Sequence, residues 1–173
     1  MGIFLSFLPW IAFMVLADSC GVRWSALVAS VIAAFVAARG GFKLLDLKGA
    51  GFFFAVLGAS FVFPQAPLTD WASVLGSAAL FLIVLTTIAI GQPFTTPYAK
   101  AMTPPEVWET AVFRRANLVI STAWLIGFGV ALVTALVTTL TTMGRPWLQP
   151  TGQIAAIAGP LLFQVWYRRR LPG

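Results

Sequence analysis

The side chains that could do acid–base, nucleophilic or metal chemistry are few in this chain. It has five carboxylates, one cysteine and no histidine among its 173 residues. Without histidine a serine–histidine nucleophile is excluded, and a single cysteine gives too few ligands for a transition-metal site. The carboxylates all lie in expected loops or at the ends of apolar runs: Asp18, Asp46, Asp70, Glu106 and Glu109. The sequence therefore predicts no catalytic residue, no metal site and no cofactor.

The apolar runs themselves carry no charge in their interiors. Ion-coupled carriers usually need an ionisable group inside the membrane, so this pattern disfavours a proton-coupled pump. The later runs are rich in threonine, with Thr134 and Thr138 as examples. Threonine hydroxyls inside apolar helices are expected to bond to their own backbone or to a neighbouring helix.

One connection, residues 91–117, has a pattern that indicates more than a turn. In Thr103-Pro104-Pro105-Glu106, a threonine followed three residues later by glutamate forms a capping box, and proline suits the first helical position. This predicts a short amphipathic helix from Thr103, held at the membrane surface by Trp108. The alternative is a plain loop whose charges only fix orientation. The candidate loop and interface residues are Thr103, Glu106, Trp108, Arg114, Arg115 and Asn117.

Long apolar helices must position these residues. The chain is 60% hydrophobic and 9% charged, whereas soluble domains carry about 25% charged residues. The predicted fold class is all-α: a polytopic membrane helix bundle of about six transmembrane helices plus a short interfacial helix, forming one integral membrane domain, 1–173. The alternative has five spans, with one lean run in the interface. The six expected spans lie near residues 3–17, 22–38, 49–63, 71–90, 117–140 and 153–167.

The basic residues are distributed unequally if each run crosses once. One side carries only Arg23 and Arg145, and the other carries Arg39, Lys43, Lys48, Lys100, Arg114, Arg115, Arg168, Arg169 and Arg170. Excess lysine and arginine marks the cytoplasmic side, so both termini are predicted to be cytoplasmic. This asymmetry also accounts for the net charge of +6 without a nucleic-acid partner.

The second expected span has a stripe of small residues at a spacing of four: Ala26, Ser30, Ala34 and Ala38. Small faces let membrane helices approach closely, which predicts a helix–helix or dimer contact. The alternative is an alanine-rich span without such a contact. Gly127 and Gly129 are similar candidates in the fifth span. The expected partners are the lipid bilayer and either a homo-oligomer or other inner-membrane proteins.

Several short motifs follow one another along the chain. Phe7-Leu8-Pro9-Trp10 opens the first span, Gly21-Val22 precedes the second and Trp71 precedes the fourth; the later ones are Pro93, Pro104, Trp108, Asn117 and Trp124. This layout resembles the bacterial intracellular septation protein A family of inner-membrane proteins. The resemblance implies a multispan protein of the bacterial inner membrane, tied to cell-envelope integrity and division. It supplies no catalytic residues.

Three functional hypotheses follow. The leading one is a non-enzymatic inner-membrane protein that supports envelope integrity or cell division through membrane and protein contacts. The alternative is a small transporter or channel that works as an oligomer. A third and weaker hypothesis is a lipid-modifying enzyme that uses the loop carboxylates.

Overall fold

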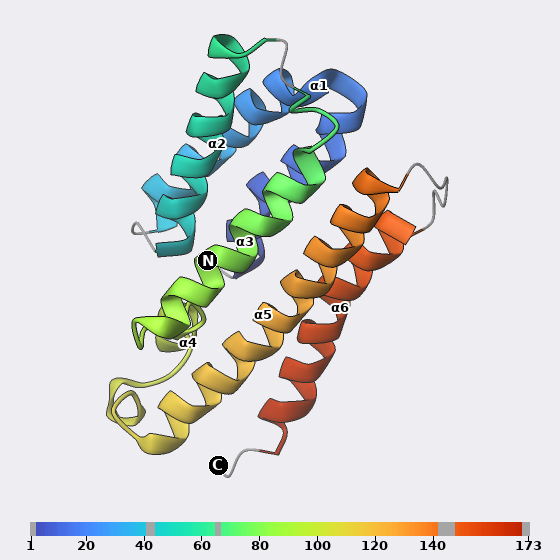
Figure 1. Ribbon diagram of the computed structural model, residues 1–173. Helices are drawn as coiled ribbons and strands as arrows, with labels where there is room; N and C mark the ends of the chain where they lie inside the picture. Colours follow the sequence, from blue (N-terminus) through green and yellow to red (C-terminus); the bar gives the residue numbers. More distant parts are fainter. Residues whose placement is uncertain (1–2, 41–43, 65–66, 142–147, 171–173) are drawn as a thin grey trace. The chain divides into compact units, whose positions relative to one another are not determined.

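The computed structural model describes residues 3–40, 44–64, 67–141 and 148–170. Lys43 and Arg145 of the charge pattern lie outside the described residues, and the Asp18 side chain is likewise not described. The described part of the chain is helical and contains no strand, which confirms the all-α class. In chain order the elements are α1 (Ile3–Gly40), α2 (Leu44–Val62), α3 (Ala72–Ala89), α4 (Thr96–Lys100), the 3₁₀ turn η1 (Pro105–Val107), α5 (Ala111–Leu140) and α6 (Leu148–Arg168) (Figure 1).

Four helices in the described residues are long and apolar enough to cross a membrane. They are Ser19–Arg39 within α1, Leu45–Val62, Ala72–Ala89 and Ala111–Leu140. These correspond to the second, third, fourth and fifth expected spans. The N-terminal apolar helix Leu5–Ala17 is shorter, and α6 is not among the candidates. The chain is therefore compatible with a membrane protein, while the count of about six spans is not confirmed.

The chain forms two compact units, Met1–Leu80 and Phe81–Gly173. In the first unit α1 packs along α2. Helix α1 is broken at Gly21, whose φ of 77° and ψ of 163° lie in a region open almost only to glycine. Pro9 and Ala33, one from each half of α1, line the same small space as Asp46 of α2. The two halves thus fold back on each other at Gly21, which separates the first two expected spans.

Trp10 is the centre of the first unit's aromatic core and is 2% exposed. Its ring centroid lies 5.2 Å from that of Phe52 and 4.6 Å from that of Phe53. A Cβ atom added to Gly49 would lie 3.3 Å from the indole, so glycine lets α2 approach this ring closely. Trp10 therefore packs α1 against α2, and its position well inside the first apolar run has a structural explanation.

The predicted small-residue stripe is divided in the structure. Ala26 and Ser30 are buried within the first unit, whereas Ala34 and Ala38 are exposed. A step of four residues turns about 400° around a helix of 3.6 residues per turn, so the stripe rotates by about 40° at each step. A contact with another molecule through Ala34 and Ala38 stays a prediction. The buried face of α1 continues instead through Ala29, Ala33 and Ala37.

In the second unit, α5 and α6 pack side by side in antiparallel directions (Figure 1). A Cβ atom on Gly127 would lie 2.6 Å from the carbonyl oxygen of Ala156 and 2.7 Å from Cγ of Pro160. Only glycine fits this approach, which confirms Gly127 as a close-packing position. Gly129 differs, because a Cβ atom there would lie 3.5 Å from the Phe81 ring, an ordinary contact distance.

The threonines of α5 use their hydroxyls locally, as the sequence predicts. The Thr134 hydroxyl donates to backbone carbonyls one turn earlier, with oxygen distances of 3.0 Å to Val130 and 2.9 Å to Ala131. The Thr138 hydroxyl reaches Thr134 O at 2.9 Å. Such bonds to the helix's own backbone satisfy hydroxyls inside an apolar helix.

Candidate functional site

The capped helix predicted from Thr103 is wrong. The Thr103 hydroxyl donates to Ala99 O at 2.9 Å, so it closes the end of α4 instead of starting a helix. The 3₁₀ turn that follows has no side-chain cap, and Pro104 is extended with φ −67° and ψ 150°. Because a residue before proline is pushed out of the α region, the double proline prevents a helix from starting at Thr103. Glu106 is exposed within this turn.

The helix begins seven positions later, at Thr110. Thr110 is extended, with φ −69° and ψ 146°, and its hydroxyl oxygen accepts from the Phe113 N–H at 3.2 Å. This is the N-cap geometry that a threonine favours. The sequence contains a weak signal, a threonine a few residues before the long apolar run that begins at Ala116. Thr110 has Phe113, not glutamate, at the third helical position. The threonine–glutamate pair at Thr103 and Glu106 is therefore the stronger capping pattern in the sequence.

Trp108 contacts two other residues of the loop. Its indole N–H donates to Thr103 O at 3.2 Å, and Nζ of Lys100 lies 5.0 Å from the centroid of a Trp108 ring. Trp108 is half-buried. Arg114 and Arg115 are exposed, and Nη1 of Arg114 lies 3.9 Å from a carboxylate oxygen of Glu109. With both side chains mostly in the open, that ion pair stabilises the loop little.

Asn117 belongs to a buried polar cluster with Thr95 and Ser121, here called the Thr95 cluster. All three residues are at most 5% exposed. The Thr95 hydroxyl oxygen lies 2.8 Å from that of Ser121, 3.2 Å from Oδ1 of Asn117 and 3.1 Å from its backbone oxygen. Since a hydroxyl has one proton, Ser121 can donate to Thr95 while Thr95 donates to Asn117. The cluster anchors the segment after α3 to α5.

Trp124 extends this anchored region along α5. It is 1% exposed, and its ring meets Phe94 edge-on with centroids 6.3 Å apart. Its indole N–H points to Oε1 of Gln164 in α6, at 3.4 Å. The sequence singled out Asn117 and Trp124 through the family resemblance, but not Thr95 or Ser121. Isolated hydroxyl residues carry no spacing signal that could have indicated them.

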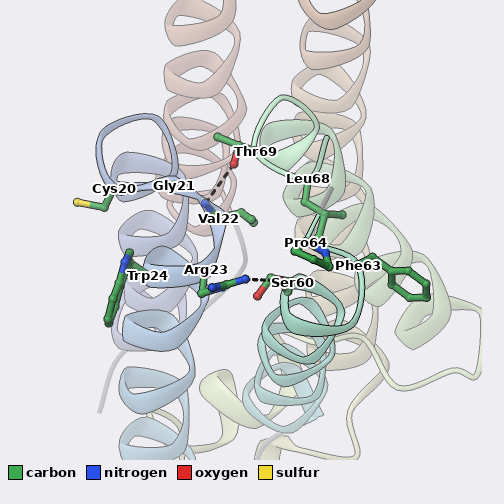
Figure 2. A pocket seen from close by; sticks show the side chains of 10 residues that line it. All are labelled: Cys20, Gly21, Val22, Arg23, Trp24, Ser60, Phe63, Pro64, Leu68 and Thr69. Carbon is green, nitrogen blue, oxygen red and sulfur yellow. Dashed lines mark hydrogen bonds between the residues drawn. The ribbon is translucent and has the colours of Figure 1, made fainter. Parts of the chain in front are cut away.

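The first unit contains a polar pocket at the break in α1, here called the Arg23 pocket. It has a volume of about 270 Å³. Figure 2 shows Arg23 reaching from α1 to the end of α2, and Val22 facing the segment that precedes α3. The lining residues are Cys20, Gly21, Val22, Arg23, Trp24, Ser60, Phe63, Pro64, Leu68 and Thr69.

Two contacts fix the Arg23 guanidinium. Its Nη2 donates to Ser60 O at 2.8 Å, and its Cζ lies 4.6 Å from the Phe61 ring centroid. Ser60 O is among the last carbonyls of α2, which lack an intrahelical partner, so the contact caps this helix. On the other wall, the Val22 N–H donates to the Thr69 hydroxyl oxygen at 3.3 Å. Both contacts follow directly after Gly21, the position at which α1 is broken.

Asp46 is buried, at 5% exposed, although it lies near the start of α2. Its Oδ1 has no hydrogen-bond partner among the described residues, and neither does the Ser30 hydroxyl. The sequence placed every carboxylate in a loop or at a span end and did not indicate a buried one. Position at a helix end does not determine burial, because the fold of α1 against α2 covers Asp46.

An apolar groove of about 580 Å³ runs between α5 and α6. Thr122 is the hydroxyl residue in its lining, and that hydroxyl already donates to Leu118 O at 2.9 Å. The groove therefore presents apolar surface and no free reactive group among these lining residues.

No protein-family model, curated protein or solved structure matches this chain. Over the residues that the structure describes, the fold defines a class: an all-helical protein with four helices compatible with crossing a membrane. The resemblance to the septation protein A family stays a prediction.

Proposed function

We propose that this protein is a non-enzymatic, multispan protein of the bacterial inner membrane, and that it supports envelope integrity or cell division through contacts with lipid and other membrane proteins. The observation that carries the proposal is the way its polar side chains are used. Buried hydroxyls bond within the chain: that of Thr87 donates to a backbone carbonyl, and that of Ser121 pairs with the Thr95 hydroxyl. The side chains exposed on the long helices include many large apolar ones, among them Val31, Phe54 and Ile126.

The contact surfaces in this proposal are of two kinds. Ala34 and Ala38 leave an exposed small-residue face on α1, suited to another membrane helix. Arg114 and Arg115 are exposed at the start of α5, next to the half-buried Trp108. Such a pair can meet anionic lipid or an acidic partner.

We further propose six crossings with cytoplasmic termini. If only the four long apolar helices crossed, Arg168, Arg169 and Arg170 would join the side of Arg23, and the basic residues would divide six to five. Six crossings give nine against two, which agrees with the positive-inside rule. A reporter fused at Gly173 separates the two arrangements, because it is cytoplasmic with six crossings and external with four.

A deletion strain tests the proposed function. We expect altered cell shape or increased detergent sensitivity, restored by the wild-type gene. Complementation with Ala34→Leu combined with Arg114→Ala and Arg115→Ala should fail, whereas Ala26→Ser, a small change at a covered position, should complement. A normal envelope in the deletion strain would contradict the proposal.

The alternative is a small oligomeric transporter, and Asp46 is the observation that favours it. A buried carboxylate in a membrane helix is costly and often belongs to an ion or proton path. The test is proton flux into liposomes that contain purified protein and a pH-sensitive dye. The leading proposal predicts flux no greater than in protein-free liposomes. Flux that Asp46→Asn abolishes would favour the transporter instead.

A further inference from the structure

The Arg23 pocket has a feature that capping alone does not require. A single N–H of Arg23 caps Ser60, yet a guanidinium has five donors in a planar fork. The side chain remains exposed beside a pocket of about 270 Å³, close to the roughly 300 Å³ at which small-ligand sites begin. The guanidinium therefore has both spare donors and adjacent space.

The charge at this pocket is not neutralised by a nearby acid in the described structure. Among the described residues, the ion pair within 4.0 Å is that of Arg114 with Glu109. Asp70, one position beyond Thr69 of the lining, is exposed and makes no such pair with Arg23. Meanwhile Ser60 O and the Phe61 ring fix the guanidinium, so little side-chain freedom remains to be lost on binding.

Arg23 also lies on the side of the membrane where the six-crossing topology places few basic residues. It is one of two basic residues on the side that the positive-inside rule leaves poor in them. Trp24 beside it is 58% exposed, as expected of a tryptophan at a membrane–water interface. With six crossings, this fixed guanidinium is expected at the level of the lipid headgroups.

We propose that the Arg23 pocket binds a phosphate group, which the guanidinium recognises through its remaining N–H donors. Its source is the headgroup of an anionic phospholipid or a free phosphate. The proposal rests on the membrane embedding and the six crossings proposed above but not on the envelope function, so it stands or falls separately from that function.

The test is direct binding to the full-length protein in neutral detergent, read by native mass spectrometry. The probes are dioleoylphosphatidylglycerol, dioleoylphosphatidylcholine and inorganic phosphate. Arg23→Gln should weaken phosphatidylglycerol binding about tenfold, as expected for one lost charge-assisted hydrogen bond. Arg39→Gln is the matched control, since Arg39 lies on the same helix with its Cζ 4.4 Å from the Phe35 ring. It should change binding by less than about twofold.

The probes also identify the source. Tight phosphatidylglycerol binding with weak inorganic phosphate binding assigns a lipid headgroup, and the reverse assigns a free phosphate. If Arg23→Gln does not fold, Leu68→Trp fills the pocket while leaving the contact between Arg23 and Ser60 in place. That variant should also lose binding. No binding by the wild type, or equal losses in Arg23→Gln and Arg39→Gln, would overturn the proposal.

Discussion

The hydroxyl oxygens of Thr95 and Ser121 lie 2.8 Å apart, although 26 residues separate them in the sequence. Both are buried, and Thr95 also reaches Oδ1 of Asn117 at 3.2 Å. In an apolar interior, an unpaired hydroxyl or amide oxygen is costly, so each member of the Thr95 cluster depends on the others. The segment after α3 is held by this cluster and by the Phe94–Trp124 contact.

Thr95→Val tests the cluster. The change removes the shared hydroxyl and leaves Ser121 and Asn117 oxygens short of a partner, so the free energy of unfolding should fall by about 1–3 kcal/mol. Sodium dodecyl sulfate titration in mixed micelles is the measurement. The control is Thr122→Val, an exposed position whose hydroxyl bonds only to Leu118 O, with an expected change below about 0.5 kcal/mol. Equal effects would mean that the cluster does not stabilise the second unit.

Gly127→Ala should weaken the packing of α5 on α6. The new methyl would meet the carbonyl oxygen of Ala156 at 2.6 Å, so the helices must separate, at a cost of about 1–3 kcal/mol. Gly129→Ala, two positions along, should be neutral or stabilise by up to about 1 kcal/mol through helix propensity. Thermal unfolding of the two variants side by side gives the answer. A stable Gly127→Ala protein would show that the two helices lie further apart.

Gly21→Ala should strain the break in α1. Space is available at this position, but the positive φ is not favourable for a residue with a Cβ atom, and the expected cost is about 1–3 kcal/mol. Gly58→Ala in the middle of α2 is the counterpart, with no atom within 4 Å and helical backbone. It should stabilise by about 0.5–1 kcal/mol. If both substitutions stabilise the protein, α1 is a continuous helix.

Thr110→Ala should fray the start of α5. Loss of the cap costs about 0.5–2 kcal/mol, and amide exchange at Phe113 should accelerate. Thr103→Ala should leave Phe113 unaffected, because the Thr103 hydroxyl bonds to Ala99 O. Hydrogen exchange across residues 106–116 distinguishes the two. An amide of Glu106 that exchanges faster in Thr103→Ala, with Phe113 unchanged in Thr110→Ala, would instead support the capping box predicted from the sequence.

Composition and hydropathy were enough to predict the helical class and the position of the four long apolar helices, because the length of an apolar run and the lack of charge inside it can be read directly from the sequence. The break between the first two runs was also predictable, and Gly21 explains it. The start of α5 could not be predicted from the sequence. Both Thr103 and Thr110 are possible N-caps, and the backbone of the folded loop around the double proline decides between them.

The candidate sites were harder to predict than the helices. Asn117 was singled out by resemblance, yet its partners Thr95 and Ser121 depend on which segments meet in space. Asp46 lies near a helix end in the sequence, and its burial follows from the way α1 folds over α2. The contact of Arg23 with Ser60 spans 37 residues and has no periodic signature.

We propose that this chain is embedded in a membrane with its basic loops on the cytoplasmic side, and one labelling experiment tests this topology most directly. Cys20 is the only cysteine and is exposed, on the side of Arg23 with either four or six crossings. In spheroplasts of a bacterial host, a membrane-impermeant maleimide should label wild-type protein at Cys20. In the double variant Cys20→Ser with Met102→Cys, the maleimide should label the protein only after the membrane is permeabilised. Met102 suits this test because it is 71% exposed in the loop before α5. Labelling of Met102→Cys in intact spheroplasts, with Cys20 protected, would contradict the proposed topology.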